Sequence, residues 1–298
     1  MKKNIIVITG GAGFVGSNLI SLLLKKTNYK IISIDNYSSG YRKNHVKSFK
    51  AKYINGDTKN ISSILNLYKK KIHSIFHFGE FSRIYQSFLK FNECIESNSI
   101  GSHAVFNFCL KNKIKLIYSA TSASLGNSGK DKNLSPYAFS KAKNLELLEN
   151  LKKWFKMNFE IIYFYNVYGP KQIKVGSMAT VIGIFENHFL RKKPLPVVKP
   201  GNQTRRFTHI DDTVKACFNA WRKNKCRHYS ITNKIDYKII DVAKMFNSKI
   251  KLLPPRKGER FASALSNMNL SNKVYRIYGK KMLKNYIKYF IKIHKKVT

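Results

Sequence analysis

The chain has 298 residues, of which 43% are hydrophobic, so it can bury the core of one large domain and is not a disordered polypeptide. Lysine and arginine number 56 against 15 aspartate and glutamate, a formal net charge of +41. The lysines are spread along the whole sequence, and no basic stripe alternates with aromatic residues. We therefore interpret the charge as a compositional drift rather than as a specific nucleic-acid site, although a positive field would suit a doubly negative substrate.

The N-terminus is basic and then apolar, as in a signal peptide, but the apolar run covers only residues 5–8 and leads directly into a glycine-rich turn. This pattern predicts a first strand. No stretch approaches the ~18 apolar residues of a membrane span. The cysteines lack C-x-x-C spacing, and we expect reduced thiols in a cytoplasmic protein. They are Cys94, Cys109, Cys217 and Cys226.

Strands and helices alternate after that point. The glycine-rich turn at residues 10–16 precedes a helical stretch at 17–26 with leucines at helical spacing, and a second strand follows at 30–34. Further apolar runs predict strands at residues 74–78, 115–119, 159–164 and 228–232, with helices such as 61–70 and 97–111 between them. This alternation predicts an α/β fold of the Rossmann type, a doubly wound parallel sheet with helices on both faces.

After Asn166 the alternation of strands and helices is less regular, and prolines recur in the predicted loops. This change predicts a smaller C-terminal lobe. We expect residues 1–166 to form the first lobe, with 205–233 returning to it, and residues 167–204 and 234–298 to form the second. The basic amphipathic tail at 280–296 suits either a membrane surface or a packed closing helix with a solvated lysine face. We favour the packed helix.

The glycine-rich turn has the spacing of a dinucleotide-binding site between a strand and a helix. Gly10 permits the tight turn, Gly13 lets the backbone approach a pyrophosphate, and Gly16 lets the helix pack on the strand. The helix N-terminus then faces the phosphates. Asp35 ends the second strand, where a carboxylate accepts hydrogen bonds from ribose hydroxyls and repels a 2′-phosphate, so the predicted cofactor is NAD. Asp57 ends the next strand and is either an adenine contact or a plain loop aspartate.

Tyr137 and Lys141 stand four residues apart, which places both side chains on one face of a helix. A tyrosine titrates near pH ~10 in isolation. A neighbouring ammonium and a positive nicotinamide ring both favour the phenolate, so we expect a lowered pKa and a tyrosine that transfers protons near neutral pH.

These motifs resemble the extended short-chain dehydrogenase/reductase family, over most of the chain from Ile5 to about Phe261. The matching segments occur in the family's order: residues 10–16, 35–40, 77–79, 118–122, 137–141, 165–170 and 204–212. The resemblance implies a cofactor site of Gly10, Gly13, Phe14, Val15, Gly16, Asp35, Asn36, Asp57, Phe78, Gly79, Asn98, Tyr137, Lys141 and Tyr165.

The resemblance also implies roles in catalysis and substrate binding. Thr121 matches the residue that hydrogen-bonds the reacting hydroxyl beside the tyrosine, so the implied catalytic set is Tyr137, Lys141 and Thr121. Asn166 and Arg205 match contacts to the substrate diphosphate. Arg256 or Arg260 would supply a second arginine there, with Arg256 slightly favoured.

The two residues after Thr121 restrict the reactions that this chain is expected to catalyse. Related sugar 4,6-dehydratases carry Asp-Glu there and decarboxylating relatives a glutamate two residues on, whereas this chain has Ser122 and Ala123. The remaining chemistry is reversible oxidation at the sugar C4, as in NAD-dependent UDP-glucose 4-epimerases. Residues 35–40 are most similar to the matching segment of those enzymes. Residues 176–180 instead resemble ADP-heptose 6-epimerases, and that alternative stays open.

Several residues depart from the family pattern. Leu125 replaces a tyrosine, Glu80 stands beside the cofactor where a small residue is usual, the loop 126–137 is short, and Arg206 replaces an aspartate. Because of these departures, the sequence does not identify the sugar of the substrate.

Rival classes are a net oxidoreductase and a non-catalytic NAD-binding scaffold, in which Tyr137 and Lys141 would be dispensable. The histidines and cysteines show no zinc spacing, and we interpret His77 as a packed, hydrogen-bonded residue. The expected partners are a nucleotide-sugar substrate and, from the resemblance, a second copy of the chain. That homodimer would form through the helices around 98–111 and 137–151.

Overall fold

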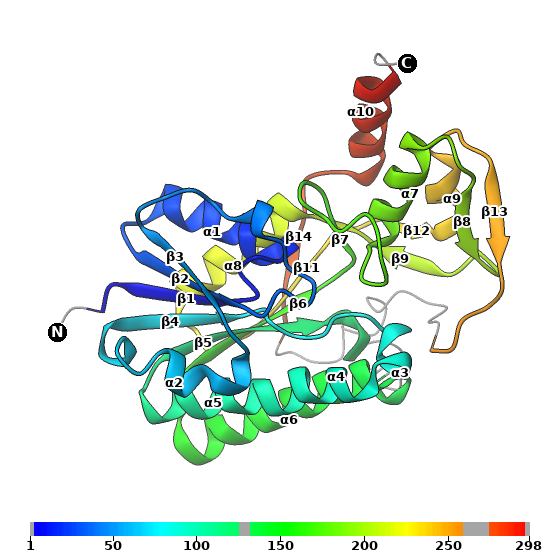
Figure 1. The fold of residues 1–298 in the computed structure, drawn as a ribbon. Helices are drawn as coiled ribbons and strands as arrows, with labels where there is room; N and C mark the ends of the chain where they lie inside the picture. The colour runs from blue at the N-terminus through cyan, green and yellow to red at the C-terminus, as the bar shows by residue number, and fades with distance from the viewer. Residues whose placement is uncertain (1–2, 125–131, 259–273, 296–298) are drawn as a thin grey trace.

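The computed structural model of the chain describes residues 3–124, 132–258 and 274–295. Its centre is a parallel sheet of eight strands in the order β14-β11-β6-β5-β4-β1-β2-β3 (Figure 1). The strands are β1 Ile5–Thr9, β2 Lys30–Asp35, β3 Ala51–Asn55, β4 Ile72–His77, β5 Lys115–Thr121, β6 Phe159–Phe164, β11 His228–Thr232 and β14 Val274–Tyr278. The central strands are short apolar runs buried on both faces, as parallel strands between two helical layers must be.

Helices cover both faces of this sheet, so the doubly wound Rossmann-type fold is confirmed. Helices α1 (Phe14–Lys26) and α8 (Ile210–Lys223) pack together on one face. Helices α5 (Ser102–Lys111) and α6 (Pro136–Phe155) lie on the other, with the short α2 (Ile61–Ile64) beside them (Figure 1).

The order of the strands reverses between β1 and β4. From β1 the chain builds outward to β2 and β3, and from β4 it builds in the other direction to β5 and β6. Thr9 at the end of β1 pairs with His77 at the end of β4. Ligands of doubly wound sheets bind where the carboxyl ends of the strands meet such a reversal, so the fold places a binding site beside these two residues.

The smaller lobe has its own apolar core, formed by residues of α7 (Val181–Leu190), α9 (Ile239–Lys244) and α10 (Leu283–Lys295). Its strands pair in twos: β7 Val167–Tyr168 with β10 Thr208–His209, β8 Leu195–Val198 with β13 Ile250–Leu253, and β9 Thr204–Arg206 with β12 Asp236–Lys238. Leu283, Ile287 and Phe290 of α10 are buried in this core, which confirms the packed closing helix. No helix in the described ranges is long and apolar enough to cross a membrane.

Three elements differ from the sequence-based expectation. The helix predicted at 61–70 ends at Ile64, and residues 65–68 form turns in which Leu65 is buried and Leu67 is 87% exposed. The stretch predicted as a helix at 97–111 begins with a π-helical segment, η4 (Glu96–Gly101), and becomes α-helical only at Ser102. Strand β14 joins the edge of the main sheet, although the sequence pattern assigns residues 234–298 to the smaller lobe.

Candidate active site

The turn between β1 and α1 is packed too closely for side chains. Gly10 has φ +70°, and a Cβ there would lie 2.8 Å from the backbone of Phe78 and Gly79. A Cβ on Gly16 would lie 2.2 Å from the Gly10 carbonyl oxygen, so only glycine lets α1 approach the turn. The N-cap of α1 is Gly13, which has no side chain to cover the first amides of the helix. This cradle of bare backbone at a helix N-terminus fits the pyrophosphate of NAD.

Asp35 supports the same turn. One carboxylate oxygen accepts from the Ala12 amide at 2.9 Å and the other from the Tyr37 amide at 2.9 Å. Burial raises the pKa of Asp35, and these backbone hydrogen bonds oppose that shift. The residue lines a small cavity of about 50 Å³ together with Asn36, Asp57 and Gly79. The Asn36 side chain donates to Asp57 at 3.0 Å, and these four predicted cofactor residues meet just beyond the carboxyl ends of β2, β3 and β4.

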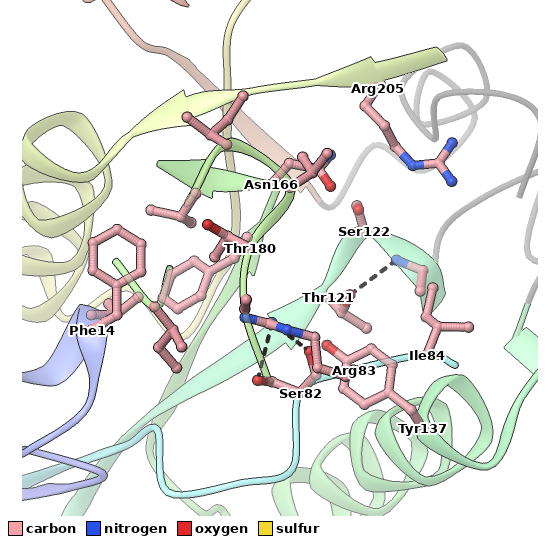
Figure 2. A pocket seen from close by; sticks show the side chains of 18 of the residues that line it. Phe14, Ser82, Arg83, Ile84, Thr121, Ser122, Tyr137, Asn166, Thr180 and Arg205 are labelled. Carbon is pink, nitrogen blue, oxygen red and sulfur yellow. Dashed lines mark hydrogen bonds between the residues drawn. The ribbon is translucent and has the colours of Figure 1, made fainter. Parts of the chain in front are cut away.

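A larger cavity of about 480 Å³ begins at this turn and extends between the two lobes. Its walls include Gly10, Phe14, Val15, Gly16, Phe78, Thr121, Tyr137, Lys141, Asn166, Arg205 and Arg256. Figure 2 shows Phe14 at one end, and Asn166 and Arg205 across the cavity from Thr121 and Tyr137. The structure thus brings the predicted cofactor turn, catalytic residues and diphosphate contacts to one space.

Local sequence fixes Tyr137 and Lys141. Ser135 is the N-cap of α6 and accepts from the Ala138 amide at 3.1 Å, and Pro136 begins the helix. Tyr137 therefore lies in the first turn and Lys141 one turn later, and their exposed fractions are 9% and 3%. Thr121 ends β5 against this helix start.

The electrostatics of Tyr137 differ from the sequence-based expectation. Burial raises the pKa of the Tyr137 phenol to about 12, although a hydrogen bond with Thr121 lowers it. The other groups that shift this pKa are Glu80, Arg83 and Cys94, whereas the Lys141 ammonium forms an ion pair with the buried Glu80. The negative charge of Glu80 itself raises the pKa of Tyr137, whereas the positive charge of Arg83 lowers it.

Asn98 and Tyr165 lie outside the cavity walls, whereas Arg256 is part of them. Asn98 is fully buried, where its side chain accepts from the Phe81 amide at 2.7 Å and donates to Ser140 at 3.2 Å. Tyr165 is 1% exposed within the core between the sheet and α5 and α6, and it lines neither cavity. Arg256 lies 5.5 Å from the centre of the Tyr85 ring at the cavity edge, and Arg260 lies outside the described residues.

Sequence reasoning missed several cavity residues, among them Ser82 and Arg83. Arg83 follows the His77–Gly79 motif, but one arginine in so basic a chain carries no distinguishing signal. Its importance appears only from its place beside Tyr137.

His77 is the packed, hydrogen-bonded residue that the sequence predicts. Its Nδ1 lies 2.7 Å from Thr9 Oγ1 and its Nε2 lies 3.0 Å from Ser102 Oγ. Burial lowers the pKa of His77 to about 4, which keeps the ring neutral. Within the part of the chain that the structure describes, no group of three histidine, cysteine or acidic residues could hold a metal ion. All four cysteines are free thiols.

Known proteins are similar to this chain in sequence and in fold. A dTDP-D-glucose 4,6-dehydratase of Dictyostelium discoideum is 30% identical over 266 residues, which cover 80% of this chain but only 60% of the relative. An ADP-L-glycero-D-manno-heptose-6-epimerase of Brachyspira hyodysenteriae is 29% identical over 222 residues, or 70% of this chain and 69% of the relative. The crystal structure of UDP-glucose 4-epimerase from Thermotoga maritima with UDP-glucose superposes with a TM-score of 0.83 at 22% identity, covering 98% of this chain and 99% of that one.

These relatives catalyse different reactions, so they show the family and not one substrate. Residues 6–232 match the sequence profile described as the NAD dependent epimerase/dehydratase family. This match covers most of the chain and includes the glycine turn, Asp35, Thr121, Tyr137 and Lys141. The chain belongs to the NAD-dependent epimerase/dehydratase family.

Proposed function

We propose that the protein is an NAD-dependent epimerase that inverts C4 of a UDP-hexose through a transient 4-keto sugar. The observation that carries this proposal is the wall of the cavity around Tyr137. Thr121 and Tyr137 face it together, while Ser122 and Ala123, the next residues of that wall, offer no general acid or base for eliminating water. The free thiols are in keeping with a reducing cytoplasm.

Different residues along the cavity would bind the cofactor, transfer the proton and bind the substrate diphosphate. Gly10, Gly13 and Gly16 would hold the NAD pyrophosphate, and Asp35 its adenosine ribose. Bound there, NAD would supply the hydride acceptor, and its reduced form the hydride donor, for reversible oxidation of the sugar.

Tyr137 takes the proton from the 4-hydroxyl and later gives it back, and Thr121 orients that hydroxyl. Asn166, Arg205 and Arg256 line the same cavity and would anchor the diphosphate. With the diphosphate anchored there, the keto sugar can turn its other face to the cofactor.

The direct test is incubation of the purified protein with UDP-glucose, and separately with UDP-galactose, with and without added NAD, followed by chromatography of the sugar nucleotides. We expect interconversion without net NADH. Absence of turnover by protein that holds NAD would contradict the UDP-hexose assignment, and accumulation of NADH would instead identify a net oxidoreductase.

A second candidate is a 6-epimerase acting on an ADP-heptose. Ala179 and Thr180, from the segment that resembles those enzymes, line the cavity, and the Brachyspira relative carries that name. The same chromatographic assay with ADP-heptoses distinguishes the two. A non-catalytic NAD-binding scaffold would turn over none of these substrates, with or without Tyr137.

We also propose that the protein is a homodimer through the outer surface of α4 (Phe91–Ile95), η4 and α6 (Figure 1). Large apolar side chains are exposed on these helices: Phe91 is 54%, Ile100 54%, Phe139 46% and Trp154 62% exposed. Exposed apolar side chains on one helical layer indicate an interface with another chain.

The dimer can be tested by substitution of its exposed residues. Because buried charges at an interface are costly, we expect the double variant Ile100→Glu, Phe139→Glu to sediment as a monomer while the wild type sediments as a dimer. Tyr289→Glu, at an equally exposed aromatic of α10, is the matched control and should stay dimeric. A monomeric wild type at micromolar concentration would contradict the proposal.

A further inference from the structure

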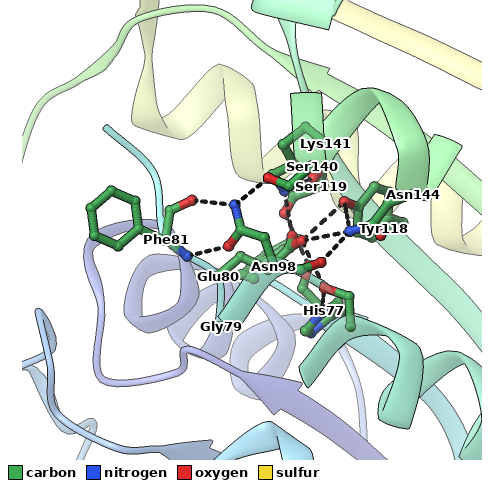
Figure 3. A network of polar contacts seen from close by, with 12 residues as sticks. His77, Gly79, Glu80, Phe81, Asn98, Tyr118, Ser119, Ser140, Lys141 and Asn144 are labelled. Carbon is green, nitrogen blue, oxygen red and sulfur yellow. Dashed lines mark hydrogen bonds and ion pairs between the residues drawn. The ribbon is translucent and has the colours of Figure 1, made fainter. Parts of the chain in front are cut away.

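Glu80 is one of only 15 acidic residues in the chain, and its side chain is 2% exposed. It follows β4 and ends in a buried polar network with Lys141, Ser102, Tyr118 and Asn144 (Figure 3). A buried carboxylate is unfavourable unless it is paired and hydrogen-bonded, and Glu80 meets both conditions through these contacts.

The direction of the hydrogen bonds shows that Glu80 acts as an acceptor. Thr9 Oγ1 accepts from the amides of Phe78 and Gly79, so its hydroxyl proton is directed to His77 Nδ1. His77 then donates from Nε2 to Ser102, whose hydroxyl donates to Glu80 Oε1 at 2.8 Å.

Three more groups donate to the same carboxylate. The Tyr118 hydroxyl donates to Oε1 at 2.9 Å, the Asn144 amide donates to Oε1 at 3.3 Å, and Lys141 donates to the other oxygen, Oε2. Burial holds the pKa of the Tyr118 phenol well above its usual value, so that group stays a donor. Both oxygens of Glu80 therefore accept, as in an ionised carboxylate.

The positive charge of the Lys141 ammonium is therefore paired with the negative charge of Glu80. Its ammonium donates to Glu80 and to the Ser119 carbonyl at 2.5 Å, and lies 4.7 Å from the centre of the Tyr118 ring. These contacts fix the position of the ammonium one helical turn from Tyr137, but the adjacent carboxylate cancels most of its field there.

Arg83 is the contrasting cation. Its guanidinium is held by the Met178 carbonyl, which accepts from Nε at 3.0 Å and from Nη2 at 2.6 Å, and by the Ser82 carbonyl at 2.8 Å from Nη1. None of these partners is charged, and no acidic side chain in the described part of the chain pairs with it. Arg83 lines the same cavity as Tyr137 (Figure 2).

From this geometry we propose that Glu80 is a positioning residue that fixes Lys141 and cancels its charge, and that Arg83 is the cation that stabilises the Tyr137 phenolate. The proposal rests on the proposed proton-transfer role of Tyr137. The sequence motif assigns the stabilisation of the phenolate to Lys141. In this proposal Arg83 has that role instead.

Every charged or titratable group that acts on Tyr137 is consistent with this division. These groups are Glu80 and Arg83 from the segment after β4, Thr121 from β5, and Cys94 from α4. Burial raises the pKa of the Cys94 thiol to about 11, so it is neutral near pH 7 and adds no charge. Lys141 on α6 is paired with Glu80, so among the groups named here that shift the pKa of Tyr137 the positive charge is that of Arg83.

The test follows the ionisation of Tyr137 directly and needs no sugar substrate. The 17 tyrosines are replaced with 3-fluorotyrosine, whose phenol is more acidic, and the Tyr137 resonance is identified by ¹⁹F NMR as the one absent from Tyr137→Phe. The protein is titrated with saturating NAD. We expect Glu80→Gln to move the midpoint to lower pH by about 1 unit and Arg83→Gln to move it to higher pH by a similar amount.

The matched control is Lys143→Gln, which removes an exposed cation of the same helix and should leave the midpoint unchanged. A Glu80→Gln curve that coincides with the wild-type curve or lies above it would overturn the proposal. If Glu80→Gln does not fold, an Arg83→Gln curve that coincides with the wild type would do the same. Because no sugar is used, absence of epimerase activity would leave this result interpretable.

Discussion

Tyr137→Phe is expected to reduce turnover of the nucleotide sugar about 10³-fold, the range that a positioned general acid–base group contributes. The variant removes only the phenolic oxygen. The ring stays 9% exposed at the cavity wall, and the main-chain hydrogen bond from Tyr137 to Ser87 at 3.2 Å remains. Steady-state assays of sugar interconversion at saturating NAD measure the effect.

Two measurements separate loss of chemistry from loss of structure. The amount of NAD bound by Tyr137→Phe should equal that of the wild type, because the glycine turn and Asp35 are untouched. Tyr289→Phe, on α10 and 64% exposed, should keep full activity. A Tyr137→Phe variant that retains more than about one tenth of wild-type turnover would be incompatible with Tyr137 as the proton-transfer group.

The cofactor cradle could be predicted from the sequence because its geometry is local. The glycine turn, the strand before it and the helix after it occupy consecutive residues, so spacing alone fixes which backbone atoms approach one another. The same holds for Tyr137 and Lys141, whose separation of four residues on a helix places both on one face.

Features that depend on distant residues could not be predicted in this way. Glu80 and Lys141 are 61 residues apart, and the pairing of β4 with β5 and the packing of α6 against β5 bring them together. The sequence showed that Glu80 was unusual for its position, but not that it would pair with Lys141 and alter the electrostatics of Tyr137.

Tyr165 illustrates a different limit. Side chains along a strand alternate between the two faces of the sheet. Phe164, the last residue of β6, lines the large cavity, whereas Tyr163 and Tyr165 face the core beneath α5 and α6. A motif match places the backbone of Tyr165 near the cofactor, but the alternation directs its side chain away from it.

Lys141→Met should destabilise the protein by about 3–5 kcal/mol, because it leaves the Glu80 carboxylate buried without its counter-ion. The methionine fills a similar volume, so a large cavity does not add to this cost. Urea unfolding followed by the fluorescence of Trp221, which is 8% exposed beside the main sheet, measures the free energy of unfolding.

The double variant Glu80→Gln, Lys141→Met distinguishes an unpaired charge from lost packing. Glutamine keeps an oxygen that accepts from Ser102 and Tyr118 but carries no charge, so we expect it to restore most of the stability that Lys141→Met loses. Lys143→Met, which breaks an exposed ion pair with Glu146 on the same helix, should leave the stability unchanged. If the double variant is no more stable than Lys141→Met alone, the buried pair is not the source of the loss. The compensation of Lys141 by Glu80 would then have to be abandoned, and with it the electrostatic role given to Arg83.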